Sequence, residues 1–149
     1  MSRIVSFRGQ LEMGVQEMIP LSTIKGLIGY KVKKFQIMSA SPGTGNIEMI
    51  GQIYKTLESS NVNSTPNFSN NRLLGVALYH DGAANDTTHF MATTIFDNEK
   101  FNQDIYVNIT DATGSTIRGN YYIELEQMSL DLNEQTVATL KDIRNVGAE

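Results

Sequence analysis

Apolar residues recur with a period of two along most of this chain, from about Arg3 to Arg144. Short clusters of Gly, Asn, Asp, Ser and Pro interrupt the alternation. Because successive side chains of a β-strand point to opposite faces of a sheet, such alternation is typical of strands that bury one face. The pattern predicts an all-β protein, an antiparallel β-sandwich of about eight to ten strands.

The longest predicted strand, residues 26–40, changes phase along its length. Its apolar positions are even-numbered before Lys33 and odd-numbered after Lys34. A change in the parity of the buried side chains indicates a β-bulge, so we expect one at these two lysines. A similar change near Gln127 predicts a second bulge, in the strand that starts at Tyr121 and continues to Leu132.

The other predicted strands are shorter, and one of them is apolar on both faces. Residues 73–79 carry apolar side chains at odd and even positions, as expected for a strand in the middle of a sheet. Gly9 is expected to end the first strand, at residues 4–7. The remaining strands are expected at residues 11–15, 47–54, 89–96 and 105–109.

The connections are unequal in length, which favours a jelly-roll or Greek-key topology over an up-and-down barrel. Residues 39–46 predict a turn. The polar segment from Glu58 to Asn71 exceeds the ~2–5 residues of a hairpin loop, so we expect it to cross between sheets, with Phe68 pinning it to the body. A single domain, residues 1–149, is expected, with residues 1–20 as a candidate N-terminal arm.

Residues 133–144 allow two interpretations. Apolar side chains at positions 137, 140 and 143 would form a helical stripe, and Glu134 would cap it. The β-branched residues at positions 136, 137 and 139 favour a strand instead. We expect a strand.

The composition disfavours several classes of protein. The chain has no Cys, which excludes disulfides and thiolate metal sites. The N-terminus has no apolar signal-peptide core, and no run approaches the ~18 apolar residues of a membrane span. The net charge of −4 disfavours nucleic-acid binding. The densest basic run, Lys31, Lys33 and Lys34 with Lys25 nearby, is interpreted as solvated strand charge that guards an edge rather than as a phosphate-binding patch.

Two histidines, His80 and His89, flank a predicted hairpin, with Asp81 and Asp86 near them. Two imidazoles and a carboxylate are a metal-ligand set. No spaced motif such as His-x-His is present, so exposed turn and strand residues are the preferred interpretation.

Oxygen ligands for Ca²⁺ form a second candidate site. Asn and Asp in the predicted turns could supply them, but no EF-hand pattern is present. Such residues are common in turns because they tolerate left-handed backbone and bond to their own main chain, which is the preferred interpretation. The residues concerned are Asp81, Asn85, Asp86 and Asp111.

Catalytic motifs are missing from the sequence. The Gly-rich segment 41–45 lacks the Gly-Lys-Ser/Thr of a phosphate-binding loop, and no Gly-x-Ser-x-Gly is present. Glu124 and Glu126 share a strand face and could act as acid and base, but outward Glu on an alternating strand usually faces solvent. We therefore expect no enzymatic activity, no cofactor and no metal. The tyrosines could form a carbohydrate-stacking platform, although core and interface roles are favoured. They are Tyr30, Tyr54, Tyr79, Tyr106, Tyr121 and Tyr122.

Three segments resemble small structural proteins of bacteriophages. They are residues 29–38 (GYKVKKFQIM), the turn Ser41-Pro42-Gly43, and the ending YYIELE at 121–126 with ATLKDIR at 138–144. The resemblance implies a capsid-associated cement or decoration subunit, or a small jelly-roll capsid protein. It also implies a symmetric homo-oligomer, trimeric or of another order, that binds other capsid proteins in the virion and assembles in the host cytoplasm.

Two other functions are weighed against this one. A carbohydrate- or receptor-binding module of a fibre or vertex would place tyrosines together in one set of loops. A small metal-dependent enzyme would be built around His80 and His89.

Overall fold

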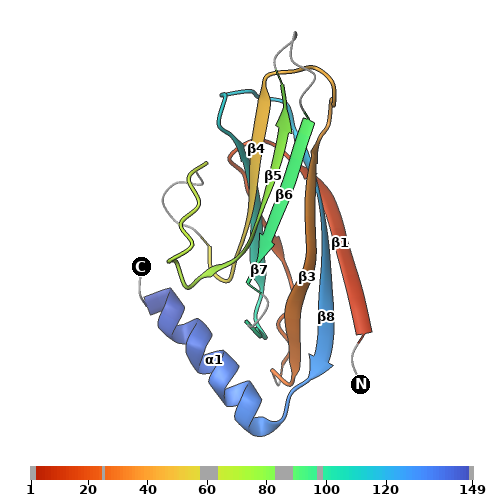
Figure 1. Ribbon diagram of the computed structural model, residues 1–149. Coiled ribbons are helices and arrows are strands. Elements are labelled where there is room, and N and C mark those ends of the chain that lie inside the picture. Colours follow the sequence, from red (N-terminus) through yellow and green to blue (C-terminus); the bar gives the residue numbers. More distant parts are fainter. Residues whose placement is uncertain (1–2, 25, 58–63, 83–88, 97–98, 148–149) are drawn as a thin grey trace.

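A computed structural model of the chain describes residues 3–24, 26–57, 64–82, 89–96 and 99–147. Two antiparallel sheets pack face to face in this part of the chain, which confirms the expected all-β sandwich (Figure 1). One sheet has the order β1-β8-β3 and the other the order β2-β7-β4-β5-β6. The elements are β1 (Arg3–Leu11), β2 (Gln16–Ile19), β3 (Ile28–Ser39), β4 (Ile47–Tyr54), β5 (Leu73–Asp81), β6 (His89–Ile95), β7 (Ile105–Asp111), β8 (Gly119–Ser129) and α1 (Leu132–Gly147).

Three of the strand pairs are nested in the sequence, each pair lying between the two strands of the next. β1 pairs with β8, β2 with β7, and β4 with β5. β3 and β6 would complete this series, but they belong to different sheets. One side-chain bond joins them, because the hydroxyl of Thr93 on β6 donates to the carbonyl of Phe35 on β3 at 2.9 Å.

The core lies between the two sheets and is almost entirely apolar. Alternate residues of β3, β4, β7 and β8 point into it, and on β3 the parity of these residues changes at the bulge. Phe35 and Ile123 from one sheet and Ile53 and Ile105 from the other have no exposed surface. β5 lies between β4 and β6 and is buried on most of both faces, as its sequence predicted.

The bulge predicted in the longest strand is confirmed, and the second one is wrong. The register of β3 on β8 shifts between Val32 and Lys34. The register near Gln127 has no shift in either pairing of β8. The apolar side chains that suggested a slip there are Met128, Leu130 and Leu132, and of these Leu130 is buried after the strand has ended. It packs on Gly29, where an added Cβ would lie only 2.6 Å from Leu130 Cδ2.

The N-terminal strands differ from the prediction. β1 runs through Gly9 because this glycine makes room for a ring: a Cβ there would lie 2.9 Å from Tyr121 Cε1. The chain turns later, where Gly14 has a left-handed φ of 81°. The expected strand at residues 11–15 is therefore wrong. Within the candidate arm, residues 3–11 pair with β8 and residues 16–19 pair with β7.

The connections that cross between the sheets do not include the one expected. Because β4 and β5 are hydrogen-bonded neighbours, the segment from Glu58 to Asn71 connects strands of one sheet, and the prediction that it crosses is wrong. The predicted turn at 39–46, which links β3 to β4, does cross, as do the connections β1–β2, β2–β3 and β7–β8. Phe68 meets Phe96 edge-on, with ring centroids 5.2 Å apart, so it does contact the body.

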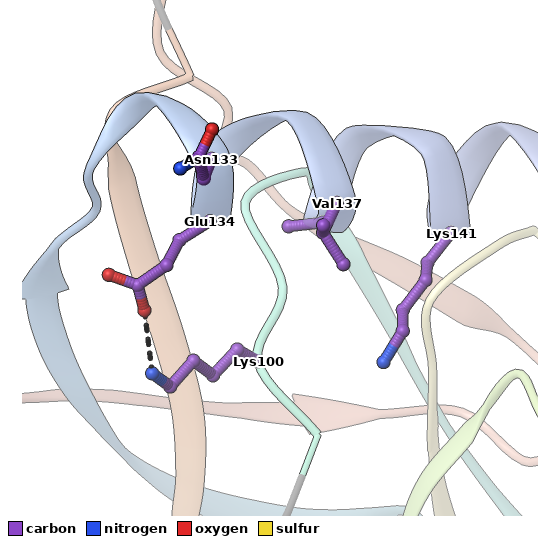
Figure 2. Close-up of a pocket in the computed structure, with 6 residues that line it drawn as sticks. Lys100, Asn133, Glu134, Val137 and Lys141 are labelled. Carbon is purple, nitrogen blue, oxygen red and sulfur yellow. Dashed lines mark hydrogen bonds and ion pairs between the residues drawn. The ribbon is translucent and has the colours of Figure 1, made fainter.

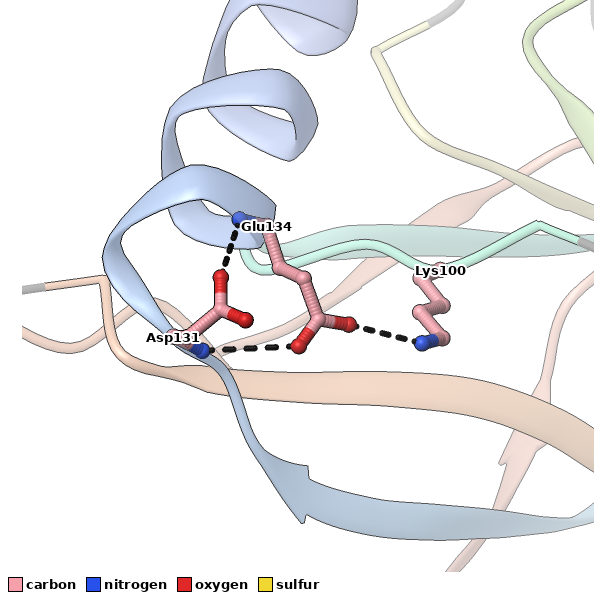
Figure 3. Close-up of polar contacts among 3 residues, drawn as sticks. All are labelled: Lys100, Asp131 and Glu134. Carbon is pink, nitrogen blue, oxygen red and sulfur yellow. Dashed lines mark hydrogen bonds and ion pairs between the residues drawn. The ribbon is translucent and has the colours of Figure 1, made fainter.

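The C-terminal segment is a helix, so the strand expected at residues 133–144 is wrong. Figure 3 shows the reason at its first turn. The carboxylate of Asp131 accepts the backbone N–H of Glu134 at 2.7 Å, and the carboxylate of Glu134 accepts the N–H of Asp131 at 3.5 Å. This reciprocal capping box satisfies two backbone donors that the start of a helix would leave free. The other carboxylate oxygen of Glu134 pairs with Lys100 at 2.8 Å, which ties α1 to the sandwich.

Candidate interaction surface

The two outer faces of the sandwich differ in charge. The outer face of the three-stranded sheet alternates acids with bases: Lys31 stands opposite Glu126, and Lys34 opposite Glu124. The Nζ of Lys34 lies 3.8 Å from a Glu124 carboxylate oxygen. The candidate acid and base Glu124 and Glu126 therefore lie among lysines on a mixed-charge face, which is typical of a solvated surface.

The outer face of the five-stranded sheet is mostly neutral. An apolar cluster of Ile50, Tyr54, Leu73 and Val76 is buried there. Next to it, three amides stand in one row across the sheet, because Asn108 on β7 is opposite both Gln16 on β2 and Gln52 on β4. This side of the sandwich thus carries apolar and amide groups where a solvated sheet would carry charges.

Asn108 is the most unusual member of this face. Its side chain is fully buried, and among the residues that the structure describes neither its amide nitrogen nor its amide oxygen has a hydrogen-bond partner. The hydroxyl of Thr110, two residues along on the same face, is also buried and has no partner in the described part of the chain. Gln52 differs, because its amide oxygen accepts the Tyr54 hydroxyl. Buried polar atoms without partners cost stability, so Asn108 is a weak point in the fold.

The most exposed part of the five-stranded sheet is its edge strand β6. Five consecutive side chains, on both faces of the strand, are exposed, and none of them carries a charge. Met91 is 51% exposed even though its rung faces the core side, opposite Tyr79. We call this set the β6 surface; it consists of Phe90, Met91, Ala92, Thr93 and Thr94.

The other sheet edges are protected in ways that β6 is not. β1 carries Arg3 and Arg8, and β3 carries Lys33 and Lys34 beside its bulge. β2 is only four residues long and is followed by Pro20. Charges, bulges, short strands and proline are the usual means by which proteins prevent edge-to-edge pairing. Among the described strands, β6 is the edge without such protection.

The structure does not bring the candidate metal ligands together. His80 stands opposite Phe90, whereas His89 stands opposite Asp81, so the two histidines occupy rungs of opposite parity. Asp86 lies outside the described residues. No group of three or more His, Asp or Glu residues in the described part of the chain is arranged to hold a metal ion.

The candidate calcium ligands that the structure describes serve as turn anchors. Asp81 is buried, and its carboxylate accepts the backbone N–H of Gly43 at 2.7 Å. Asp111 accepts the N–H of Thr113 at 2.8 Å and its hydroxyl at 2.6 Å. The Asp111 bonds close its own turn, as Asx motifs do, whereas the Asp81 bond anchors the distant turn at residues 39–46. Asn85 lies outside the described residues, as does Asp86.

The tyrosines form no shared platform. Tyr30, Tyr54, Tyr79 and Tyr121 are buried. Tyr106 and Tyr122 are half-buried and belong to different sheets. Burial, together with the hydrogen bond from its hydroxyl to Glu17 at 2.6 Å, raises the pKa of Tyr121 well above its usual range. This arrangement fits core packing of the aromatic rings rather than stacking on a sugar.

A cavity of about 300 Å³ lies beside α1 (Figure 2). It is lined by Lys100, Asn133, Glu134, Val137, Ala138 and Lys141. Lys100 and Glu134 already neutralise each other, and this contact raises the pKa of Lys100. These lining residues include no Ser, Thr or Cys, and their single carboxylate, that of Glu134, is paired with Lys100.

Several buried polar residues were not singled out from the sequence, and they hold loops in place. The side chain of Lys55 is 2% exposed and pairs with Glu99 at 2.7 Å. Asn102 is fully buried and donates to the carbonyl of Gly26 at 3.1 Å and to the hydroxyl of Thr139 on α1 at 3.0 Å. Nothing in the local pattern distinguishes these residues from solvated ones, because their partners are distant in the sequence.

Asp104 anchors the segment that follows β2. One oxygen of its carboxylate accepts the backbone N–H of Leu21 at 2.8 Å and that of Ser22 at 2.9 Å. Burial acts to raise the pKa of Asp104, but the hydrogen bonds from these two residues outweigh it and lower that pKa below its ordinary value. The charged carboxylate is therefore a structural element of this loop.

No protein-family model matches the chain, and no curated protein matches its sequence. In the part of the chain that the structure describes, no helix has the length and apolar character needed to span a membrane. The candidate site is thus defined by the structure alone, and it is the β6 surface.

Proposed function

We propose that this chain is a non-enzymatic structural subunit of a virion, a capsid-associated cement, decoration or minor capsid protein. In this proposal it acts through protein–protein interfaces with copies of itself and with other capsid proteins. The observation that carries the proposal is the β6 surface, an exposed, uncharged and unprotected sheet edge on an otherwise well-packed sandwich. Such an edge is suited to pairing with another chain.

The order of the strands supports the same proposal. A jelly roll is a two-sheet sandwich of eight strands wound from two Greek keys, and viral capsid domains use it. The observed pairs β1–β8, β2–β7 and β4–β5 agree with such winding, and the Thr93–Phe35 bond supplies a contact between β3 and β6. A jelly-roll topology is thus part of the proposal. Lectins share this architecture, so the fold supports the function only by analogy.

Density-gradient sedimentation of lysate from cells that produce the chain naturally tests the proposal. Quantitative mass spectrometry of each fraction should find the chain with capsid-sized particles, in a constant ratio to their other proteins. Detergent-free washing at raised salt should leave it bound, because the proposed contacts are uncharged. A chain found only in the low-mass fractions would contradict the proposal.

A further inference from the structure

We infer that β6 pairs with β6 of a second copy of this chain, in antiparallel orientation about a two-fold axis at Ala92. The two five-stranded sheets would then form one continuous sheet across the dimer. This inference rests on the proposed function, because it names the partner of the same β6 surface.

In the described part of the chain, no strand pairs with the outer edge of β6, so its backbone hydrogen-bonding groups there are available. The N–H of Phe96 donates to the carbonyl of Leu74 on β5 at 3.1 Å, in continuation of the rung that joins Gly75 and Ile95. In an antiparallel ladder, hydrogen-bonded and non-hydrogen-bonded rungs alternate, so the even-numbered residues of β6 bond to β5. The N–H and C=O groups of Met91 and Thr93 therefore point away from β5, towards the free edge.

A second β6 fits this edge by symmetry. Ala92 is the middle of the seven-residue strand, so an axis through it gives the longest possible overlap. Met91 of each copy then stands opposite Thr93 of the other, and both residues offer the backbone groups that such a rung needs. Because the same patch meets itself, the contact closes after two copies and does not propagate into a fibre.

The side chains on this register are compatible at every rung of the exposed set. Phe90 stands opposite Thr94 and diagonal to Ala92 of the second copy, whose small side chain leaves space for the ring. No formal charge faces another, because none of these residues is charged. Self-pairing of β1 about its middle residue, Phe7, would instead bring Arg8 of the two copies to diagonal positions, with a cost from like charges.

A single cysteine provides a direct test, because the chain has none of its own. On the proposed axis, Ala92 faces Ala92 across a non-hydrogen-bonded rung, where Cα atoms lie about 4.5 Å apart. This distance is within the ~4.4–6.8 Å that a disulfide spans. With oxidised glutathione, the purified Ala92→Cys chain should form a disulfide-linked dimer at least about tenfold faster than the matched Ser6→Cys chain, since pairing raises the effective concentration of the thiols.

Ser6 is a suitable control because it is exposed on β1, the edge strand of the other sheet. Light scattering after size exclusion should show the mass of the unmodified chain rising towards twice 16.5 kDa with concentration. Ala92→Lys should hold it at the monomer mass, because two ammonium groups would meet on the axis. Ser6→Lys should leave the dimer intact, and far-UV circular dichroism checks that each variant is folded.

Three results would overturn the inference. One is a chain that stays monomeric and whose Ala92→Cys variant crosslinks no faster than Ser6→Cys. Another is an oligomer that Ala92→Lys does not weaken, because that oligomer must use a different surface. The third is a monomeric Ala92→Cys chain whose thiol is protected from alkylation by an extended segment of another protein.

The failure of this inference is distinguishable from failure of the proposed function. A chain that dimerises through Ala92 but sediments with no particle contradicts the function and leaves the dimer established. In the opposite case, the wild type and Ala92→Lys sediment with particles equally well, and Ala92→Cys never crosslinks. That result contradicts the dimer alone.

Discussion

Gly51 and Gly75 provide a matched pair of substitutions that tests how tightly the two sheets pack. Both glycines lie on core-facing rungs of neighbouring strands, Gly51 on β4 and Gly75 on β5. A Cβ added at Gly51 would lie 2.8 Å from Ile37 Cγ2 and 2.9 Å from Phe35 Cζ. A Cβ added at Gly75 would lie 3.5 Å from its nearest neighbour, the carbonyl oxygen of Thr94.

These distances predict opposite signs for the same chemical change. At Gly51 the contacted side chains, Phe35 and Ile37, are at most 2% exposed and cannot swing into solvent. Overpacking of such a site costs about 1–3 kcal/mol, which exceeds the ~0.4–1 kcal/mol gained because alanine restricts the unfolded chain. Gly51→Ala should therefore lower the free energy of unfolding by about 1–2 kcal/mol. Gly75→Ala meets ordinary contacts and should raise it by about 0.4–1 kcal/mol.

Urea unfolding followed by far-UV circular dichroism measures both changes, and the slope of the transition should stay the same in each variant. The two melting temperatures should differ by about 3–12 °C for a chain of this size. In a double-mutant cycle, Ile37→Ala removes the methyl that clashes, so it should cost less in the Gly51→Ala background than in the wild type. Equal stabilities of Gly51→Ala and Gly75→Ala would refute the argument that β3 packs directly on Gly51.

Three further predictions concern single polar residues. The Asp104→Asn substitution should lower the free energy of unfolding by about 1 kcal/mol at pH 7. Folding lowers the pKa of Asp104, so the stability that its carboxylate contributes is present above about pH 4 and is lost as the pH falls through the folded pKa. The urea unfolding curves of the wild type and of Asp104→Asn should therefore converge in acid. Asn108→Leu should stabilise the protein by about 1–2 kcal/mol in urea unfolding, since it removes two buried atoms without partners. Asp131→Ala should cost about 0.5–2 kcal/mol and reduce the helical circular dichroism signal, whereas Asp131→Asn should retain most of both.

Parity allowed the strands and the first bulge to be predicted, because it is a local property of the sequence. The change at Lys33 and Lys34 reflects a real shift of register, so the pattern was sufficient. Near Gln127 the same rule failed, since the burial of Leu130 is achieved by a chain that has left the strand and packs on Gly29. That contact joins residues distant in the sequence, and periodicity carries no information about it.

For helix α1 the sequence contains two local signals, a capping box at its start and a run of β-branched residues, and the prediction followed the second. Three β-branched residues near position 137 favour a strand, but propensity is a weak prior compared with an end that satisfies its own backbone donors. Asp131 followed by Glu134 is the sequence signature of a capping box, and it could have identified the start of α1. The ion pair of Glu134 with Lys100 could not have been predicted from local spacing.

The candidate site depends on sheet order, which the sequence alone does not determine. The alternation of β6 looks like that of any half-buried strand, and its central or edge position follows from which distant strands pair. Asn108 illustrates the same limit: its parity predicts a solvated amide on the outer face, yet its side chain is fully buried. The histidines were considered because they are chemically versatile, but the register separates them onto rungs of opposite parity.

The exposure of β6 follows from the unequal widths of the two sheets. Three strands cannot cover five, so the last strand of the wider sheet extends past its counterpart, and even its core-facing Met91 is exposed. The other sheet edges carry charges, or are short and followed by a proline, whereas the described residues 90–94 of β6 include neither a charge nor a proline. The strand that the narrower sheet leaves uncovered is thus also the strand that lacks charge or proline. A second sheet edge would correct both at once, because it would satisfy the free backbone groups and cover the exposed apolar side chains.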